Sequence, residues 1–137
     1  IRARCEAWMV QLADALELAI PIRQAITGVV FEVRQGYKSK DSKRQNADIA
    51  NAANAYANGY IPCLMVMSAQ IDDDIVARYH AAKWAILQGY IGTSPMASTF
   101  SFFEQVIGFN FIQFMDNNQN YFKEKIKLVL EQLMRAT

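Results

Sequence analysis

The sequence predicts an α/β fold, with a strand-helix-strand core carrying a small mixed or parallel sheet, helices flanking it, and a helical carboxyl-terminal third. Two apolar segments with strand character, residues 28–37 and 60–69, are separated by one helical segment. Strand, helix and strand joined by short connections form a right-handed crossover in almost every known case, so the two strands are expected to be parallel neighbours. Residues 98–135 are interpreted as helices.

The composition is that of one ordinary globular domain spanning residues 1–137, with 53% apolar and 20% charged residues. No run of eighteen apolar residues occurs, so we expect no membrane span. Cys5 and Cys63 are far apart and lack CxxC spacing, which favours reduced, buried thiols in a cytoplasmic protein over a zinc site or a disulfide framework. Because the chain starts at Ile1 inside a predicted helix, it is open whether it is a fragment of a longer chain.

The first helix and the first strand are predicted from the spacing of apolar residues and from the position of Pro21. Apolar residues at helical spacing predict an amphipathic helix within residues 1–19 that ends before Pro21. In the strand at residues 28–37, alternation places Phe31 and Val33 on one face and Glu32 and Arg34 on the other. One face of this strand is expected to pack, while the other presents an acid beside a base.

A second helix and a buried strand follow. Asp41 or Ser42 can cap a helix that runs to about Ala57 and ends at Gly59. Its apolar stripe is expected to be Ile49, Ala50, Ala53, Tyr56 and Ala57. Residues 60–69 are nearly all apolar without helical phase, which is typical of a strand buried on both faces in a parallel sheet.

An acidic run, residues 72–74, complements the amino terminus of a third helix that we expect to include Ile86. A loop over residues 88–97 follows. Ser98 or Ser101 can start a fourth, phenylalanine-rich helix, and a turn at residues 116–118 separates it from a fifth helix over about 120–135.

The carboxyl-terminal third contains more aromatic residues than the surface of a small monomer holds. They are Phe100, Phe102, Phe103, Phe109, Phe111, Phe114, Tyr121 and Phe122. Most are expected in the core. A surplus apolar face would be buried by a homodimer through these helices, or by docking onto an amino-terminal region outside this chain.

Positive charge is concentrated after the first strand. Residues 34–44 contain five cations and a single acid, Asp41, whereas the whole chain carries a net charge of +1. The cations are Arg34, Lys38, Lys40, Lys43 and Arg44. A concentrated patch at the carboxyl end of a parallel strand suits a polyanion, and we expect Lys38, Lys40, Lys43 and Arg44 to bind nucleic acid. A solvated turn is the alternative.

An acid and a cation two residues apart on a strand, followed by a lysine-rich turn and a helix, resemble the active-site hairpin of the PD-(D/E)XK nuclease superfamily, which includes type II restriction endonucleases. Glu32-Val33-Arg34 stands at the (D/E)XK position, and Pro21-Ile22 lies at a suitable distance upstream for the PD element. Gln45 falls where some of these nucleases carry a glutamine in the next helix. The resemblance covers roughly residues 1–70.

The resemblance implies a Mg²⁺-dependent DNA endonuclease with Glu32, Arg34 and Gln45 in the catalytic site. Glu32 would be one metal ligand, and Asp14 or Glu17 on the first helix are candidates for a second. The sequence departs from the family pattern twice: Ile22 replaces the metal-binding aspartate and Arg34 replaces the lysine. Arginine stays protonated, so it can stabilise phosphate charge but cannot act as a base.

Three alternatives stay open at this point. Glu32 can simply pair with Arg34 or Lys38 on a solvated sheet edge. The domain can bind nucleic acid without cutting it. It can also be a mostly helical protein-interaction or assembly domain in which the basic turn is incidental.

Overall fold

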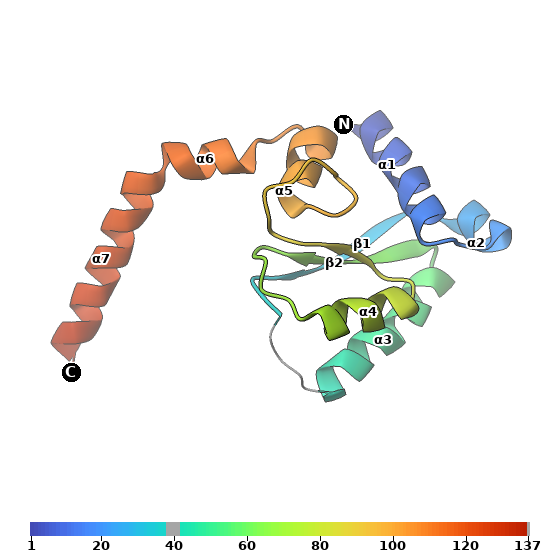
Figure 1. Ribbon diagram of the computed structural model, residues 1–137, viewed down its shortest axis with the longest axis horizontal. Coiled ribbons are helices and arrows are strands. Elements are labelled where there is room, and N and C mark those ends of the chain that lie inside the picture. Colours follow the sequence, from blue (N-terminus) through green and yellow to red (C-terminus); the bar gives the residue numbers. More distant parts are fainter. Residues whose placement is uncertain (38–41, 137) are drawn as a thin grey trace.

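A three-stranded parallel sheet lies at the centre of the computed structural model, which describes residues 1–37 and 42–136 (Figure 1). The strands are β1 (Gly28–Arg34), β2 (Tyr60–Val66) and β3 (Ala85–Leu87), in the order β1-β2-β3. Helices flank the sheet, and the carboxyl-terminal region is helical. The predicted α/β class is therefore confirmed.

The crossover predicted between the first two strands is present. Helix α3 (Ser42–Ala57) connects β1 to β2, and the two strands pair in parallel from Gly28 opposite Tyr60 to Arg34 opposite Val66. Every residue of β2 from Ile61 to Val66 is buried, because β2 is central and covered on both faces. β1 is an edge strand.

One face of the sheet is covered by α1 (Arg2–Ala15) and α5 (Thr99–Phe102), with a short π-helical turn, η1 (Phe103–Ile107), after α5. The rings of Trp8 and Phe102 lie 4.5 Å apart between their centroids, and Phe31 from β1 lies 5.7 Å from Phe102. Cys63 is buried in the same cluster, and burial raises the pKa of its thiol. Both cysteines are free.

The other face is covered by α3 and α4 (Asp73–Ala81) (Figure 1). Tyr79 and Trp84 are buried there, with ring centroids 5.3 Å apart, against Leu64 and Ile86 from the sheet. The Asp72 side chain accepts a hydrogen bond from the Asp74 backbone N–H, as expected for the predicted acidic start of this helix.

The first predicted helix is too long. α1 ends at Ala15, Glu17 adopts a left-handed φ of 51°, and a separate helix, α2 (Ile20–Ala25), contains Pro21 in its first turn. Proline fits the first turn of a helix because the N–H that it lacks would have no partner inside the helix. Pro21 therefore starts a helix here instead of only following one.

The third predicted helix is also too long. α4 ends at Ala81, Lys83 takes a left-handed φ of 62°, and Ile86 belongs to strand β3. β3 pairs in parallel with β2, and all three of its residues are buried. The tertiary position beside β2 decides the conformation of this short apolar run.

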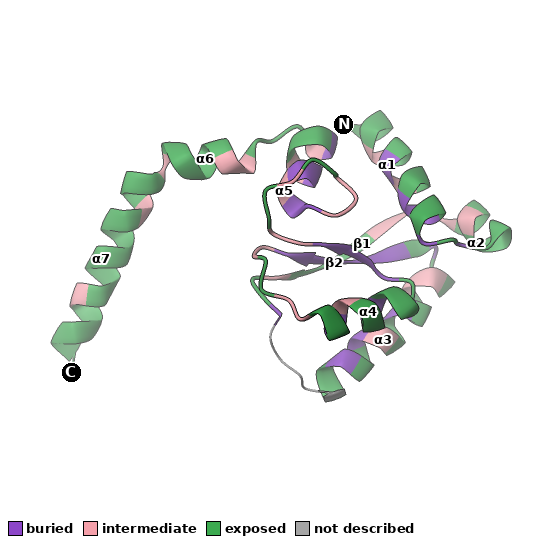
Figure 2. Ribbon diagram, in the orientation of Figure 1, coloured by how far each residue is buried: buried purple, intermediate pink, exposed green. Residues whose placement is uncertain are grey.

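Residues 109–136 form an arm that extends away from the body of the protein, which contains the sheet and the helices that cover it (Figure 1). Gly108, with a φ of 88°, ends η1, so the predicted phenylalanine-rich helix is divided and α6 (Phe111–Asn117) begins anew. Helix α7 (Gln119–Ala136) follows, and none of its residues is buried, as Figure 2 shows. Among the described residues, no helix is both long and apolar enough to cross a membrane.

Candidate functional site

Arg34, at the end of β1, is the centre of a polar cluster. Its Nη2 lies 2.6 Å from Asp48 Oδ2 on α3 and 3.4 Å from Glu32 Oε1 on its own strand. Its guanidinium also lies over the ring of Tyr37, 4.7 Å from the centroid. One arginine therefore joins two carboxylates, one from the strand and one from the crossover helix.

The Asp48 carboxylate has a second donor. Tyr79 donates its hydroxyl hydrogen to Asp48 Oδ2 at 2.5 Å, and the hydroxyls of Tyr37 and Tyr79 are 3.0 Å apart. Burial raises the pKa of Tyr79, and its hydrogen bonds to Asp48 and Tyr37 raise it further. The phenol therefore stays protonated and holds the carboxylate in place.

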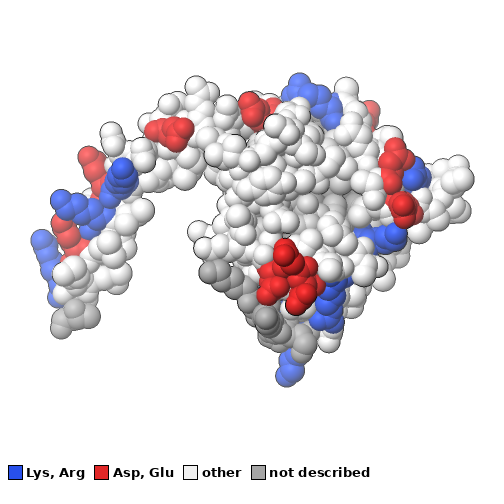
Figure 3. Space-filling view, viewed as in Figure 1, with Lys and Arg blue, Asp and Glu red and all other residues white. Residues whose placement is uncertain are grey.

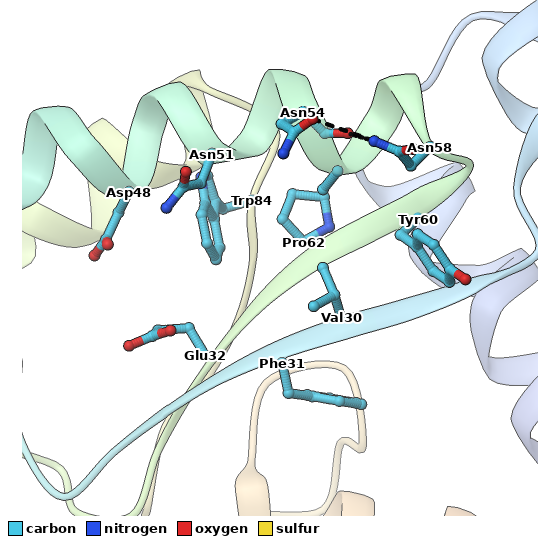
Figure 4. Close-up of a pocket in the computed structure, with 11 residues that line it drawn as sticks. Val30, Phe31, Glu32, Asp48, Asn51, Asn54, Asn58, Tyr60, Pro62 and Trp84 are labelled. Atoms are coloured by element: carbon cyan, nitrogen blue, oxygen red, sulfur yellow. Dashed lines mark hydrogen bonds between the residues drawn. The ribbon is translucent and has the colours of Figure 1, made fainter.

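Strand alternation explains why Glu32 and Arg34 meet Asp48. Phe31 packs against Trp8 and Phe102 on the α1 side of the sheet, so its neighbours in sequence point toward α3. Figure 4 shows Glu32 directed toward the Asp48 end of α3 and Phe31 on the opposite side of the strand. The prediction that one face of β1 packs while the other carries an acid beside a base matches this arrangement.

An open pocket of about 320 Å³ runs between α3 and β1 next to this cluster (Figure 4). Its polar lining comes from Glu32, Asp48, Asn51, Asn54 and Asn58. Its other lining residues are Val30, Phe31, Ala55, Tyr60, Pro62 and Trp84. Carboxylate and amide oxygens thus gather along one side of the helix, which is suitable chemistry for a hard cation or for hydrogen-bond donors.

The pocket also contains polar groups without partners. The indole N–H of Trp84 is buried and has no hydrogen-bond partner among the described residues. Arg34 Nε, in the adjoining cluster, is likewise buried without a partner. Unpaired buried donors are uncommon in native proteins, and they are expected where a ligand or water completes the hydrogen bonding.

Gln45 does not line the pocket that Glu32 and Asp48 share. Its side-chain oxygen accepts a hydrogen bond from Arg78 Nη1 at 2.7 Å, and Arg78 also donates to Asn46. Gln45 lines a second pocket, with Asp72, Asp74, Ile75 and Arg78. The residue expected beside Glu32 therefore ties α3 to α4.

Asp14 and Glu17, the predicted second metal ligands, lie at the end of α1 and just beyond it, on the opposite side of the sheet from α3 (Figure 1). Asp14 forms an ion pair with Arg23. The structure brings neither residue to Glu32. The carboxylate that shares the pocket with Glu32 is Asp48.

The predicted basic patch is described in part. Lys43 and Arg44 are exposed at the start of α3, whereas Lys38 and Lys40 lie outside the described residues. Figure 3 shows an acidic patch close to this basic end of α3. It is formed by Asp72, Asp73 and Asp74 at the start of α4. The acidic patch lowers the local excess of positive charge.

Sequence reasoning missed Asp48, although a signal for it existed. From Lys43 to Ala57, the buried positions of α3 are Gln45, Asp48 and Ala52, at helical spacing, whereas Ala50 and Ala53 from the predicted stripe are exposed. An acid on the inward face of a helix is rare unless it has a partner. Arg34, the cation of the preceding strand, is that partner.

The described residues contain no group of three or more histidine, cysteine, aspartate and glutamate side chains that could hold a metal ion. The oxygen donors available in the pocket are the two carboxylates and the neighbouring amides. Comparison with protein-family models, with curated proteins and with solved structures found no match, so the site is assessed on its geometry.

Proposed function

We propose that this chain carries the catalytic site of a cytoplasmic, Mg²⁺-dependent DNA endonuclease of restriction type, with Glu32 as a metal ligand. The observation that carries the proposal is the meeting of Glu32 and Asp48 at one open pocket, with Arg34 between them, at the end of a parallel strand. Glu32 and Arg34 lie in the carboxyl-terminal half of β1, near the end of open α/β sheets where ligands usually bind. The pocket extends from there toward the amino ends of the strands, where Val30 and Tyr60 line it.

The donor set fits magnesium. This ion prefers oxygen ligands and is commonly held by one or two carboxylates, with water and substrate phosphate completing its shell. Glu32 is half exposed and offers an accessible oxygen, and Asp48 is fixed in orientation by Arg34 and Tyr79. When bound, the ion would polarise the phosphodiester and lower the pKa of a bound water.

Arg34 has an electrostatic role in this proposal. Its permanent charge lies between the two carboxylates and holds them together. It cannot remove a proton from water. Lys43 and Arg44, together with Lys38 and Lys40, are proposed to contact the DNA backbone, where charge matters more than base geometry.

The test is Mg²⁺-dependent nicking of supercoiled plasmid. Glu32→Gln should lower the rate at least about 100-fold, because it removes a metal-binding charge and leaves the shape unchanged. Asp14→Asn and Glu17→Gln are matched controls on the other side of the sheet and should nick at the wild-type rate. Nicking that survives Glu32→Gln, or that persists in EDTA, would rule the proposal out.

A second candidate function is nucleic-acid binding without hydrolysis. It is favoured by the position of Arg34, whose guanidinium is already paired with the two carboxylates that a metal would need. In this case no nicking is observed, and salt-dependent DNA binding survives Glu32→Gln but weakens in the Lys43→Ala, Arg44→Ala double variant. A chain that binds no nucleic acid at low salt would instead fit a protein-interaction domain.

A further inference from the structure

Helix α7 carries an apolar stripe, and none of the residues of this helix is buried in the described part of the chain. The stripe consists of Ile126, Val129, Leu130, Leu133 and Met134, at the spacing of one helix face. Each of these side chains is more than half exposed, and the exposed fraction of Met134 is 77%. Figure 3 shows charged side chains along one side of the arm and uncharged surface on the other.

We propose that this α7 stripe binds the α7 stripe of a second copy of the chain, in antiparallel orientation about a twofold axis at the level of residue 129 along the helix. A helix face is complementary to itself when a twofold axis relates the two copies, since each apolar row can fill the groove of the other. Such a groove is present along α7 between two neighbouring rows of side chains. Ile126, Leu130 and Met134 form one row, and Lys123, Lys127 and Glu131 form the other.

The charges beside the stripe select the antiparallel orientation. Lys127 and Glu131 border the groove and lie equally far, in opposite directions along the helix, from Val129. An antiparallel pair whose twofold axis crosses the Ile126, Leu130 and Met134 row at the level of residue 129 therefore sets Lys127 of one copy beside Glu131 of the other, twice per dimer. In a parallel pair related by a twofold axis, Lys127 of one copy and Glu131 of the other lie on opposite sides of the interface, so these ion pairs do not form. Neither residue forms an ion pair within the described chain.

The area of the stripe sets the strength of the dimer. Five large apolar side chains that are more than half exposed present roughly 500 Å² per copy, so a dimer buries at most about 1,000 Å² of them, near the lower limit of specific interfaces. The dimer should therefore form and dissociate with protein concentration. Its existence does not depend on the proposed nuclease site, because α7 lies outside that site.

The experiment is sedimentation equilibrium of the full chain over a range of concentrations. The wild-type chain should show a monomer-dimer equilibrium, and Ile126→Glu and Leu130→Glu should each give a monomer throughout. Leu128→Glu is the matched control: it makes the same change on the opposite face of the same helix, where Leu128 is 51% exposed. Helix content by circular dichroism should be the same in all three variants.

Charge reversal tests the orientation. Lys127→Glu and Glu131→Lys should each weaken the dimer about tenfold at low salt, since two exposed pairs per dimer are changed, and combining the two reversals should restore it. A wild-type chain that stays monomeric, equal weakening by Leu128→Glu, or a combined variant as weak as either single reversal would overturn the proposal.

Discussion

Asp48 is the residue on which the stability of the site depends most. The Asp48 and Arg34 side chains are only 12% and 14% exposed, and Asp48 also accepts the hydrogen bond of Tyr79. Removing one partner of a buried ion pair leaves the other charge uncompensated. We therefore expect Asp48→Ala to lower the free energy of unfolding by about 3–5 kcal/mol, measured by urea denaturation. A loss below about 1 kcal/mol would show that Arg34 finds other partners.

Glu32 should behave differently, although it belongs to the same cluster. Its side chain is 50% exposed and 3.4 Å from Arg34, so solvent screens most of the interaction. Glu32→Gln should change the free energy of unfolding by less than about 1 kcal/mol in the same urea measurement. Loss of nicking in this variant would then report on chemistry, and a large loss of stability would remove that interpretation.

The buried thiol and phenols predict weaker folding in alkali. Burial raises the pKa of Cys63 above its ordinary 9.0 and that of Tyr56 from 10.0 to about 12. A raised pKa means that the unfolded chain loses these protons first, so the stabilisation is complete below the ordinary pKa and is lost as the pH rises. The free energy of unfolding should fall from about pH 9 upward, and Cys63→Ala should reduce the early part of the fall.

At the residue scale, the sequence predicts which side chains lie together when they are a few positions apart. It does not predict contacts between side chains that only the tertiary fold brings together. Alternation alone places Glu32 beside Arg34 on the face opposite Phe31. Asp48 and Tyr79 come from separate elements, and nothing local shows that their side chains meet. The pairing of Gln45 with Arg78, across two helices, is invisible for the same reason.

At the scale of elements, the approach of two strand ends requires a glycine. A Cβ on Gly89, just after β3, would lie 2.3 Å from the backbone carbon of Met67, which follows β2. Backbone cannot move aside as a flexible side chain can. Gly89→Ala should therefore cost about 3 kcal/mol or more in urea denaturation. Gly36→Ala is the control, because its Cβ would meet only Ser68 Oγ at 3.3 Å and Gln70 at 3.6 Å; equal losses would contradict the argument.

Elements with strong patterns are predictable, and short ones are not. β1, α3 and β2 follow from alternation, helix capping and a continuous apolar run. β3 has three residues, too few for any periodicity, and it is a strand because β2 offers a parallel partner. The split between η1 and α6 depends on the left-handed backbone of Gly108, which the surrounding phenylalanines do not reveal.

At the scale of the whole molecule, the helices that cover one face of the sheet come from segments distant in sequence. α1 and α5 share one face, and their contact joins the start of the chain to its last third: Arg4 Nε donates to the Val106 carbonyl at 2.9 Å. This closure occurs before the arm begins. The body therefore has a complete set of helices on the sheet without any residue of α7.

That arrangement predicts the effect of removing the arm. A chain that ends at Asn118 should unfold at the same urea concentration as the full chain, because α7 has no buried residue. The truncated chain should also be monomeric by sedimentation, since it lacks the α7 stripe. Plasmid nicking by this chain, compared at a concentration where the full chain is monomeric, should be unchanged. A truncated chain that unfolds earlier would show that α7 packs on the body in solution.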